Sequence, residues 1–317
     1  MSILGRGLER WNTFWFAPKS TINITWIRIL LGLTSLLWGL ALLPDFAAFY
    51  FHDGLFAQPS YSNWRIGALQ WFRQDEAAVV AVVVLIVSAL SLTAGRFVKL
   101  AAPLIWYTMM SLQQDLIVMM NASDVLLRLW AFYFAVFAVL TPSRYLSIGP
   151  RGRRTEPGGE RRWPLGPAWV LRVFQFQLCA IYIATAIAKA PGSRWHNGTA
   201  ASIALGLEEF ERFYVPGFVR ENVILGSLST WIAFGLEITL PLLLWNRRTR
   251  LLAIVLGIAL HFSFDYAMRL GYFFPGMLIG YVAFMRPGDA HSILRFIRRA
   301  VARVSLLRSH RVQQEFG

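Results

Sequence analysis

Apolar residues occupy eight long blocks of this 317-residue chain. The blocks cover residues 22–43, 77–94, 100–120, 124–141, 166–190, 225–246, 251–267 and 271–285. A helix of about 20 apolar residues is long enough to cross a hydrocarbon core of ~30 Å. The pattern therefore predicts an all-α, polytopic membrane protein with about eight transmembrane helices.

The composition agrees with a protein that lives in lipid. Hydrophobic residues make up 56% of the chain and charged residues only 15%, whereas soluble domains carry roughly 25% charged residues. The single cysteine, Cys179, excludes an internal disulfide and a thiolate metal cluster. The five histidines form no HxxxH pair, and we predict no metal site.

Lysine and arginine gather in alternate connections between the blocks. Of the 31 such residues, 21 fall in the five segments that would share one side of the membrane, and 6 fall in the four segments on the other side. Cytoplasmic loops of membrane proteins carry the excess of Lys and Arg. The distribution therefore predicts cytoplasmic termini and a multi-pass protein of the cytoplasmic (inner) membrane.

The end of the chain has a pattern of its own. Residues 291–312 mix apolar residues with six arginines, which is typical of an amphipathic helix on an anionic leaflet. We predict a transmembrane domain over residues 1–287 and a basic amphipathic cytoplasmic tail over 288–317. Topology and the lipid bilayer account for the net charge of +14, so we expect no nucleic-acid partner.

Two long connections, 44–76 and 191–224, fall on the outer side and are rich in Phe, Tyr and Trp. Such segments lie at the interface between lipid and water. One interpretation is simple anchoring there. The other is that the connections cover a site open to the outer face.

Ionisable and polar side chains gather in the outer halves of four predicted helices. An ionisable side chain in the membrane usually faces the bundle interior and a partner. Asp124 and Arg128 are spaced i,i+4 and could pair, and His261 and Asp265 share a helix face by the same spacing. A structural polar network and a site for proton transfer both fit this layer, whose members are Asp115, Asp124, Arg128, Lys189, His261 and Asp265.

Lys189 is the strongest candidate for chemistry. It ends an apolar helix, and Trp195 follows six residues later. Burial disfavours the ammonium form of a lysine, and a neutral amine can act as a base. The alternative is a lysine that extends toward outer phosphates. Glu237 lies in the middle of a predicted span, where it is protonated, paired with a buried arginine, or functional.

Several short motifs together resemble the HTTM family, the membrane domain shared by vitamin K-dependent gamma-carboxylase and many bacterial proteins. Their order and spacing carry the resemblance, which runs through residues 10–287. The motifs are Trp26-Ile-Arg28-Ile-Leu-Leu-Gly32, Asp53-Gly54-Leu55, Asn121 to Leu126, Gln177 to Lys189 with Trp195 and Gly198, and His261 followed by Gly271-Tyr-Phe-Phe-Pro275-Gly-Met277.

The resemblance implies a reaction. In the carboxylase, a lysine at the end of the matching helix deprotonates reduced vitamin K, the oxygenated quinone abstracts a glutamate proton, and carbon dioxide adds. Lys189 resembles that lysine. Where the carboxylase has a histidine at the start of the fourth helix, this chain has Ala122, Ser123 and Asp124. The carboxylase also has a large lumenal C-terminal region with no counterpart here, so lipid-quinone chemistry fits better than propeptide-directed carboxylation.

Two hypotheses follow. The first is a carboxylase-like membrane lyase that uses a reduced, vitamin K-like lipid quinol to modify a secreted or periplasmic peptide. Lys189 and His261 would be catalytic, and the binding or polar network would comprise Asp115, Asp124, Arg128, Trp195 and Asp265. The second is a non-catalytic membrane maturation, assembly or transport factor. Transport is the least favoured, because the chain shows no duplicated half.

Overall fold

The computed structural model describes residues 3–55, 66–72, 74–146, 154–155, 161–286 and 288–289. The described residues up to Phe284 belong to one compact unit, and Met285 begins a second. Apart from residues 288 and 289, the predicted basic tail lies outside the described residues and stays a prediction.

Each of the eight predicted blocks corresponds to one α-helix. These are α2 (Ile22–Ala41), α4 (Asp75–Ala94), α5 (Val98–Asp115), α6 (Ala122–Leu140), α7 (Trp169–Lys189), α11 (Val223–Trp245), α12 (Arg250–Ala267) and α13 (Phe273–Val282). Within the described residues, six of them are long and apolar enough to cross a membrane, namely α2, α4, α6, α7, α11 and α12. The protein is thus an all-α multi-pass membrane protein, and the full count of eight spans stays a prediction.

The remaining two helices, α5 and α13, explain why six and not eight of the described helices are long and apolar enough to cross a membrane. α5 has 18 residues but is more polar, and it ends in Gln113, Gln114 and Asp115. α13 has only 10 residues, because its block begins in a turn at Gly271 (φ +63°) and helical structure starts at Phe273. Glycine takes this left-handed conformation without the steric cost that other residues meet.

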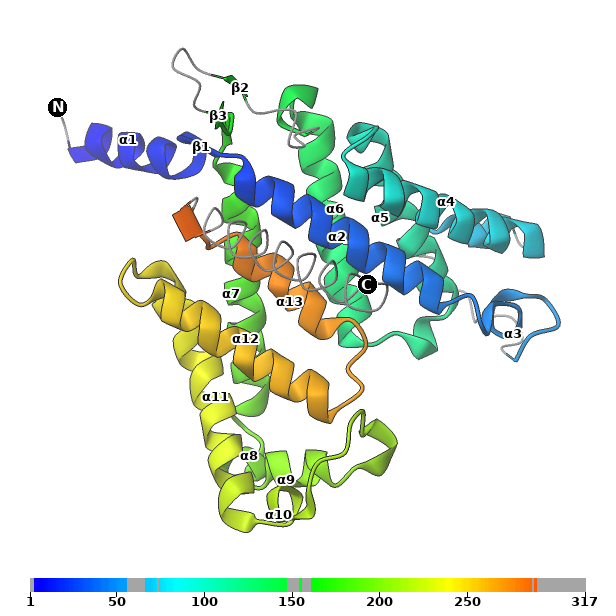
Figure 1. Ribbon diagram of the computed structural model, residues 1–317, viewed down its shortest axis with the longest axis vertical. Coiled ribbons are helices and arrows are strands. Elements are labelled where there is room, and N and C mark those ends of the chain that lie inside the picture. The colour runs from blue at the N-terminus through cyan, green and yellow to red at the C-terminus, as the bar shows by residue number, and fades with distance from the viewer. Residues whose placement is uncertain are drawn as a thin grey trace, which may run out of the picture. The chain divides into compact units, whose positions relative to one another are not determined.

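The long helices form two groups (Figure 1). In the first, α2 packs on α4, α4 on α5, and α5 on α6; in the second, α11 packs on both α7 and α12. The short helix α13 contacts α2 and α6 of the first group and α7 and α12 of the second. Gly276 and Gly280 allow this close approach, because a Cβ at either position would come within 2.9 Å of a leucine side chain.

Segments that the charge pattern predicts on one side of the membrane do meet in space. On the predicted inner side, β1 (Pro18–Ser20) pairs antiparallel with β4 (Leu165–Pro167), with Lys19 opposite Gly166. β2 (Arg154–Thr155) pairs with β3 (Arg161–Arg162) in the same connection. The apolar pattern could not predict these short strands, since each is only two or three residues long. Nearby, α1 (Ile3–Phe16) packs against α7.

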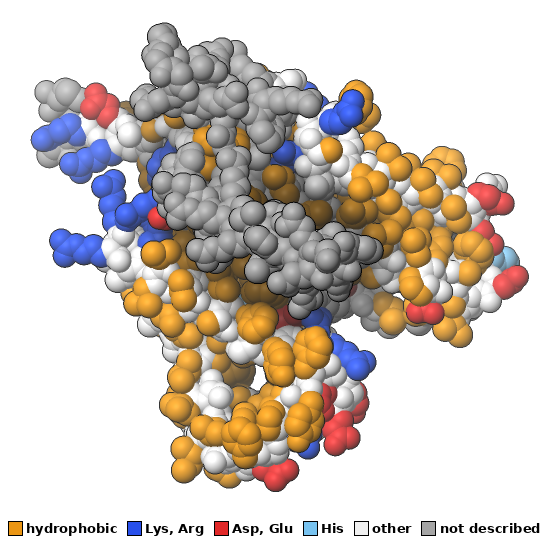
Figure 2. Space-filling model, in the orientation of Figure 1, with side chains coloured by type: hydrophobic (Ala, Val, Ile, Leu, Met, Phe, Trp, Pro, Cys, Tyr) orange, Lys and Arg blue, Asp and Glu red, His pale blue; other side chains and the backbone are white. Residues whose placement is uncertain are grey.

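On the predicted outer side, the ends of α6 and α13 are joined. The backbone N–H of Tyr272 donates to Ser123 Oγ at 3.1 Å. In the first outer connection, His52 follows the short helix α3 (Phe46–Tyr50), and its backbone N–H donates to the Asp75 carboxylate at the start of α4. In the view of Figure 2, many basic side chains lie around α1 and the α11–α12 turn, and most acidic ones lie around α3 and at the end of α11 away from that turn. The orientation relative to the cytoplasm stays a prediction.

Short helices complete the connections. The outer connection between α7 and α11 contains α8 (Ser193–His196), α9 (Ala200–Leu205), η5 (Glu208–Phe210) and α10 (Gly217–Arg220), and we call residues 193–220 the roof segment. α8, α9 and α10 all pack on α11. Single 3-10 turns occur at η1 (Ala68–Gln70), η2 (Ile117–Met119) and η3 (Ser143–Tyr145).

Candidate functional site

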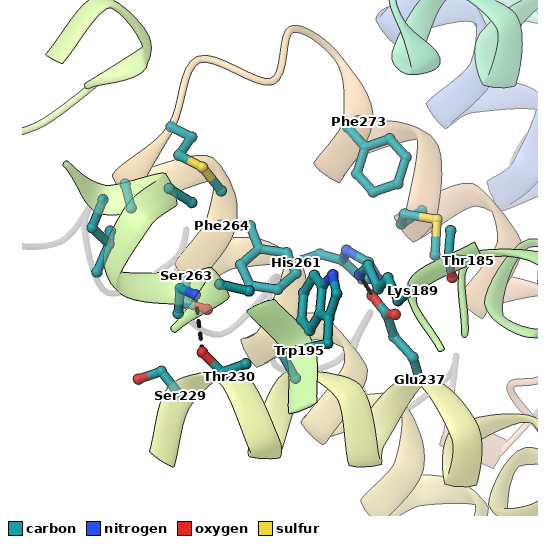
Figure 3. A pocket seen from close by; sticks show the side chains of 18 of the residues that line it. Thr185, Lys189, Trp195, Ser229, Thr230, Glu237, His261, Ser263, Phe264 and Phe273 are labelled. Carbon is teal, nitrogen blue, oxygen red and sulfur yellow. Dashed lines mark hydrogen bonds and ion pairs between the residues drawn. The ribbon is translucent and has the colours of Figure 1, made fainter. Parts of the chain in front are cut away.

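A cavity of about 500 Å³ lies among α7, α11, α12, the start of α13 and the roof segment. Most of its lining is apolar. Figure 3 shows several polar side chains along its walls, with Lys189, Glu237, Trp195 and His261 gathered in one part of it. Such an apolar cavity with a few convergent polar groups is the usual form of a small-molecule site.

Residue spacing explains why side chains of α7, α11 and α12 point into the same cavity. On α7, Tyr182, Ala186 and Lys189 follow at intervals of four and three, so they lie on one face of the helix. The buried face of α11 carries Thr230, Ala233 and Glu237 by the same rule. His261 continues the buried face of α12 that includes Gly257 and Leu260.

Lys189 forms an ion pair with Glu237 inside the cavity. Lys189 Nζ lies 2.5 Å from Glu237 Oε1, and the side chains are 22% and 5% exposed. Lys189 Nζ also lies 4.4 Å from the centre of the Trp195 ring, a distance at which a cation is attracted to the aromatic face. Of the open interpretations of Glu237, the structure thus favours pairing, but with Lys189 instead of an arginine.

His261 is held by a tyrosine. Its Nε2 lies 2.7 Å from the hydroxyl of Tyr182, and that hydroxyl also contacts the hydroxyl of Tyr281 on α13. His261 is only 3% exposed, and its ring packs against Phe273. The imidazole therefore has little freedom to rotate.

Among the residues that the structure describes, two buried polar atoms at this site lack a protein partner. They are Nδ1 of His261 and Oε2 of Glu237, and both residues line the cavity. Buried polar atoms in proteins are nearly always hydrogen-bonded to protein, water or ligand. The arrangement thus has capacity to bind polar atoms of a small molecule.

Asp265 does not line the cavity but holds the roof segment to the end of α12. Arg212 Nη1 lies 2.6 Å from Asp265 Oδ2, and Arg212 Nη2 donates to the Gly271 carbonyl at 3.3 Å. Beside this pair, Glu211 and Met268 form a short antiparallel bridge. His261 and Asp265 share a helix, but only His261 reaches the cavity.

The three other predicted site residues lie in the first helix group. Asp124 Oδ2 accepts from Asn121 N at 3.0 Å in a capping box, and its Oδ1 accepts from Trp38 Nε1 at 2.8 Å. No ion pair between Asp124 and Arg128 forms among the described residues, because the carboxylate turns back to cap the helix. Arg128 instead makes a long contact of 3.8 Å with the sulfur of Met120.

Asp115 lies near the outer connection 44–76. Burial, and then the charges of Asp115 and Asp124, raise the pKa of the Tyr50 hydroxyl in α3. That hydroxyl donates to the Leu112 carbonyl at 3.3 Å. Asp115 thus belongs with Asp124 to this end of the first group, while Lys189, Trp195 and His261 are brought together in the cavity.

Sequence reasoning missed Tyr182 and Tyr281. Both hydroxyls are carried by helix faces that otherwise look like ordinary apolar core. Glu237 was identified, since a carboxyl in an apolar span is rare, but its partner could not be deduced. Among the described residues, no cluster of three or more His, Cys, Asp or Glu could hold a metal ion.

The comparisons with known proteins agree with this architecture. The model of the HTTM domain matches residues 16–288, which include every long helix. No curated protein and no solved structure matches the chain. Because the matched region covers most of the sequence, the chain belongs to the HTTM family.

Proposed function

We propose that this membrane protein is a carboxylase-like lyase whose cavity uses Lys189 as a base toward a reduced lipid quinone. The observation that supports this most strongly is the Lys189–Glu237 pair, 2.5 Å apart, in a mostly apolar cavity beside His261. An amine in such a place is positioned to accept a proton from a weakly acidic, apolar molecule.

The volume and the chemistry of the cavity support a quinol as its ligand. Its volume of about 500 Å³ falls within the range of small-molecule sites. Apolar walls suit the rings and the chain, and the unpartnered atoms of His261 and Glu237 suit the hydroxyl groups. A bound quinol would supply an acidic hydroxyl and reducing equivalents.

Each of the four residues gathered in the cavity then has a distinct role. For this step the proton of the pair lies on Glu237, which is hydrogen-bonded to Lys189 Nζ. Lys189 is then a neutral amine and accepts the substrate proton at Nζ. Trp195 covers the lysine with an aromatic face and excludes water. His261 holds a substrate oxygen. We further propose that the second substrate is a secreted or periplasmic peptide approaching from the outer side.

The test is the oxygen-dependent consumption of a reduced naphthoquinone by the purified protein in lipid discs. General-base catalysis contributes about 100-fold or more, so Lys189→Ala should lower the rate at least that much. Lys189→Arg should not restore it, since a guanidinium stays protonated.

Lys99→Ala is the matched control, because Lys99 is exposed and lies far along the chain from the cavity residues. Its rate should equal that of the wild type. If Lys189→Ala folds normally and keeps the wild-type rate, the base hypothesis is wrong. A non-catalytic role in maturation, assembly or transport would then be the better account.

A further inference from the structure

Three hydrogen-bonding side chains form a continuous chain through the second helix group. It runs from Tyr281 on α13 through Tyr182 on α7 to His261 on α12. Tyr182 and Tyr281 are each 1% exposed and His261 3%. Water therefore does not compete for these bonds, and each hydrogen must be donated to one of the three groups or to a bound molecule.

The direction of donation can be worked out from the partners. If Tyr281 donates to Tyr182, and Tyr182 donates to His261 Nε2, then both hydroxyl hydrogens are used. His261 then carries its own hydrogen on Nδ1. In the opposite direction, His261 donates to Tyr182 and Tyr182 donates to Tyr281. The hydroxyl hydrogen of Tyr281 would then have no acceptor among the described residues.

The first arrangement leaves fewer buried groups unsatisfied, and unsatisfied buried donors are costly. The second nitrogen of a histidine is commonly fixed in this way by the bond that the first one makes. The Tyr281–Tyr182 pair thus decides which nitrogen of His261 carries the hydrogen.

We propose that Tyr182 and Tyr281 are positioning residues that fix His261 in the tautomer with hydrogen on Nδ1, so that the site offers a donor to an oxygen of its substrate. This rests on the proposed function, since the substrate is the one that Lys189 would deprotonate. Glu237 Oε2, the other unpartnered atom, adds an acceptor. The site then suits an aromatic hydroxyl, which can accept from His261 and donate to Glu237.

The first experiment reads the tautomer directly, by NMR of the full-length protein in lipid discs with isotope-labelled histidine. The His261 signal is identified by its loss in His261→Gln. We expect hydrogen on Nδ1 in the wild type. Tyr182→Phe should move the hydrogen to Nε2 or give a mixture of tautomers, and Tyr281→Phe should give a mixture.

Tyr133→Phe is the control, because the Tyr133 hydroxyl donates to Gln177 and neither residue lines the cavity. It should leave the His261 signal unchanged. Hydrogen on Nε2 in the wild type would overturn the proposal, and so would an unchanged tautomer in Tyr182→Phe. An unchanged tautomer in Tyr281→Phe alone would remove Tyr281 from it.

The second experiment measures the affinity of 1-naphthol and of naphthalene, which share the ring system and differ in the hydroxyl. One hydrogen bond to a buried group corresponds to about a tenfold tighter Kd. We expect 1-naphthol to bind at least that much better to the wild type, and most of this advantage to disappear in Tyr182→Phe. Equal affinities for both compounds would overturn the proposal.

These measurements involve no turnover, so their failure is distinct from failure of the base hypothesis. If His261 has the expected tautomer but Lys189→Ala keeps the wild-type rate, only the proposed reaction is contradicted. If Lys189→Ala loses activity but His261 has the other tautomer, Lys189 remains the base and only the positioning by the tyrosines is contradicted.

Discussion

The two helix groups differ in where their buried polar atoms without a protein partner lie. In the first group, Asp124 caps α6 and accepts from Trp38, and buried Arg28 donates to the carbonyls of Leu92 and Thr93 at the end of α4. Among the described residues, both groups have buried polar atoms without a protein partner: Arg28 Nε, Ser35 Oγ and Gln113 Oε1 in the first, and His261 Nδ1 and Glu237 Oε2 in the second. His261 and Glu237 line the cavity, whereas Arg28, Ser35 and Gln113 do not. Unpaired atoms that line a cavity are available to a ligand.

The Lys189–Glu237 pair gives the largest expected effect on stability. Removing one partner of a buried ion pair leaves a lone charge and costs about 3–5 kcal/mol, whereas replacing both by apolar residues costs much less. We therefore expect Lys189→Met to unfold much more easily than the double variant with Glu237→Leu. The measurement is the free energy of unfolding in lipid discs.

Lys189 is partly exposed, and solvent screening reduces this difference. Equal stability of the single and double variants would mean that the pair is solvated and that the cavity is wetter than the structure indicates. Lys99→Met controls for the general loss of a lysine and should change the free energy by less than about 0.5 kcal/mol.

The Asn121 cap provides the matching test in the first group. Asn121 Oδ1 accepts from the backbone N–H groups of Ser123 and Asp124, so Asn121→Ala should cost about 1 kcal/mol of stability. Asn222 caps α11 in the same way, and Asn222→Ala should cost a similar amount. If Asn121→Ala also weakened 1-naphthol binding, the first group would belong to the ligand site.

The Arg212–Asp265 pair should have the smallest effect on stability. Its side chains are 29% and 15% exposed, and partly exposed ion pairs contribute about 1 kcal/mol or less. We expect Arg212→Met to change unfolding little but to speed ligand release, because the roof segment loses a contact with α12. Stopped-flow measurement of 1-naphthol dissociation checks this, with Arg194→Met as control.

The sequence predicted the helices well because apolar length is a strong signal. The charge pattern predicted the side of each connection but not which of them meet, as the bond between Tyr272 and Ser123 illustrates. What it could not predict is which polar residues of one layer share a site. The sequence predicts that Asp124 and Lys189 lie at a similar depth in the membrane. Only the packing of the helices shows that they lie in different groups.

Local competition explains the remaining differences at the site. The i,i+4 spacing of Asp124 and Arg128 suggested a pair, but Asp124 is the third residue of α6, where a carboxylate can bond back to the residue before the helix. Glu237 and Lys189 are 48 positions apart, and no local pattern connects them. The same holds for Tyr182 and Tyr281.

The most direct test of the account is a structure of the protein determined with a reduced naphthoquinone bound. The account predicts density for the ring in the cavity, with one oxygen between His261 and Glu237 and beside Lys189. Density beside Asp115, Asp124 and Arg128, with the cavity empty or filled by side chains, would contradict it.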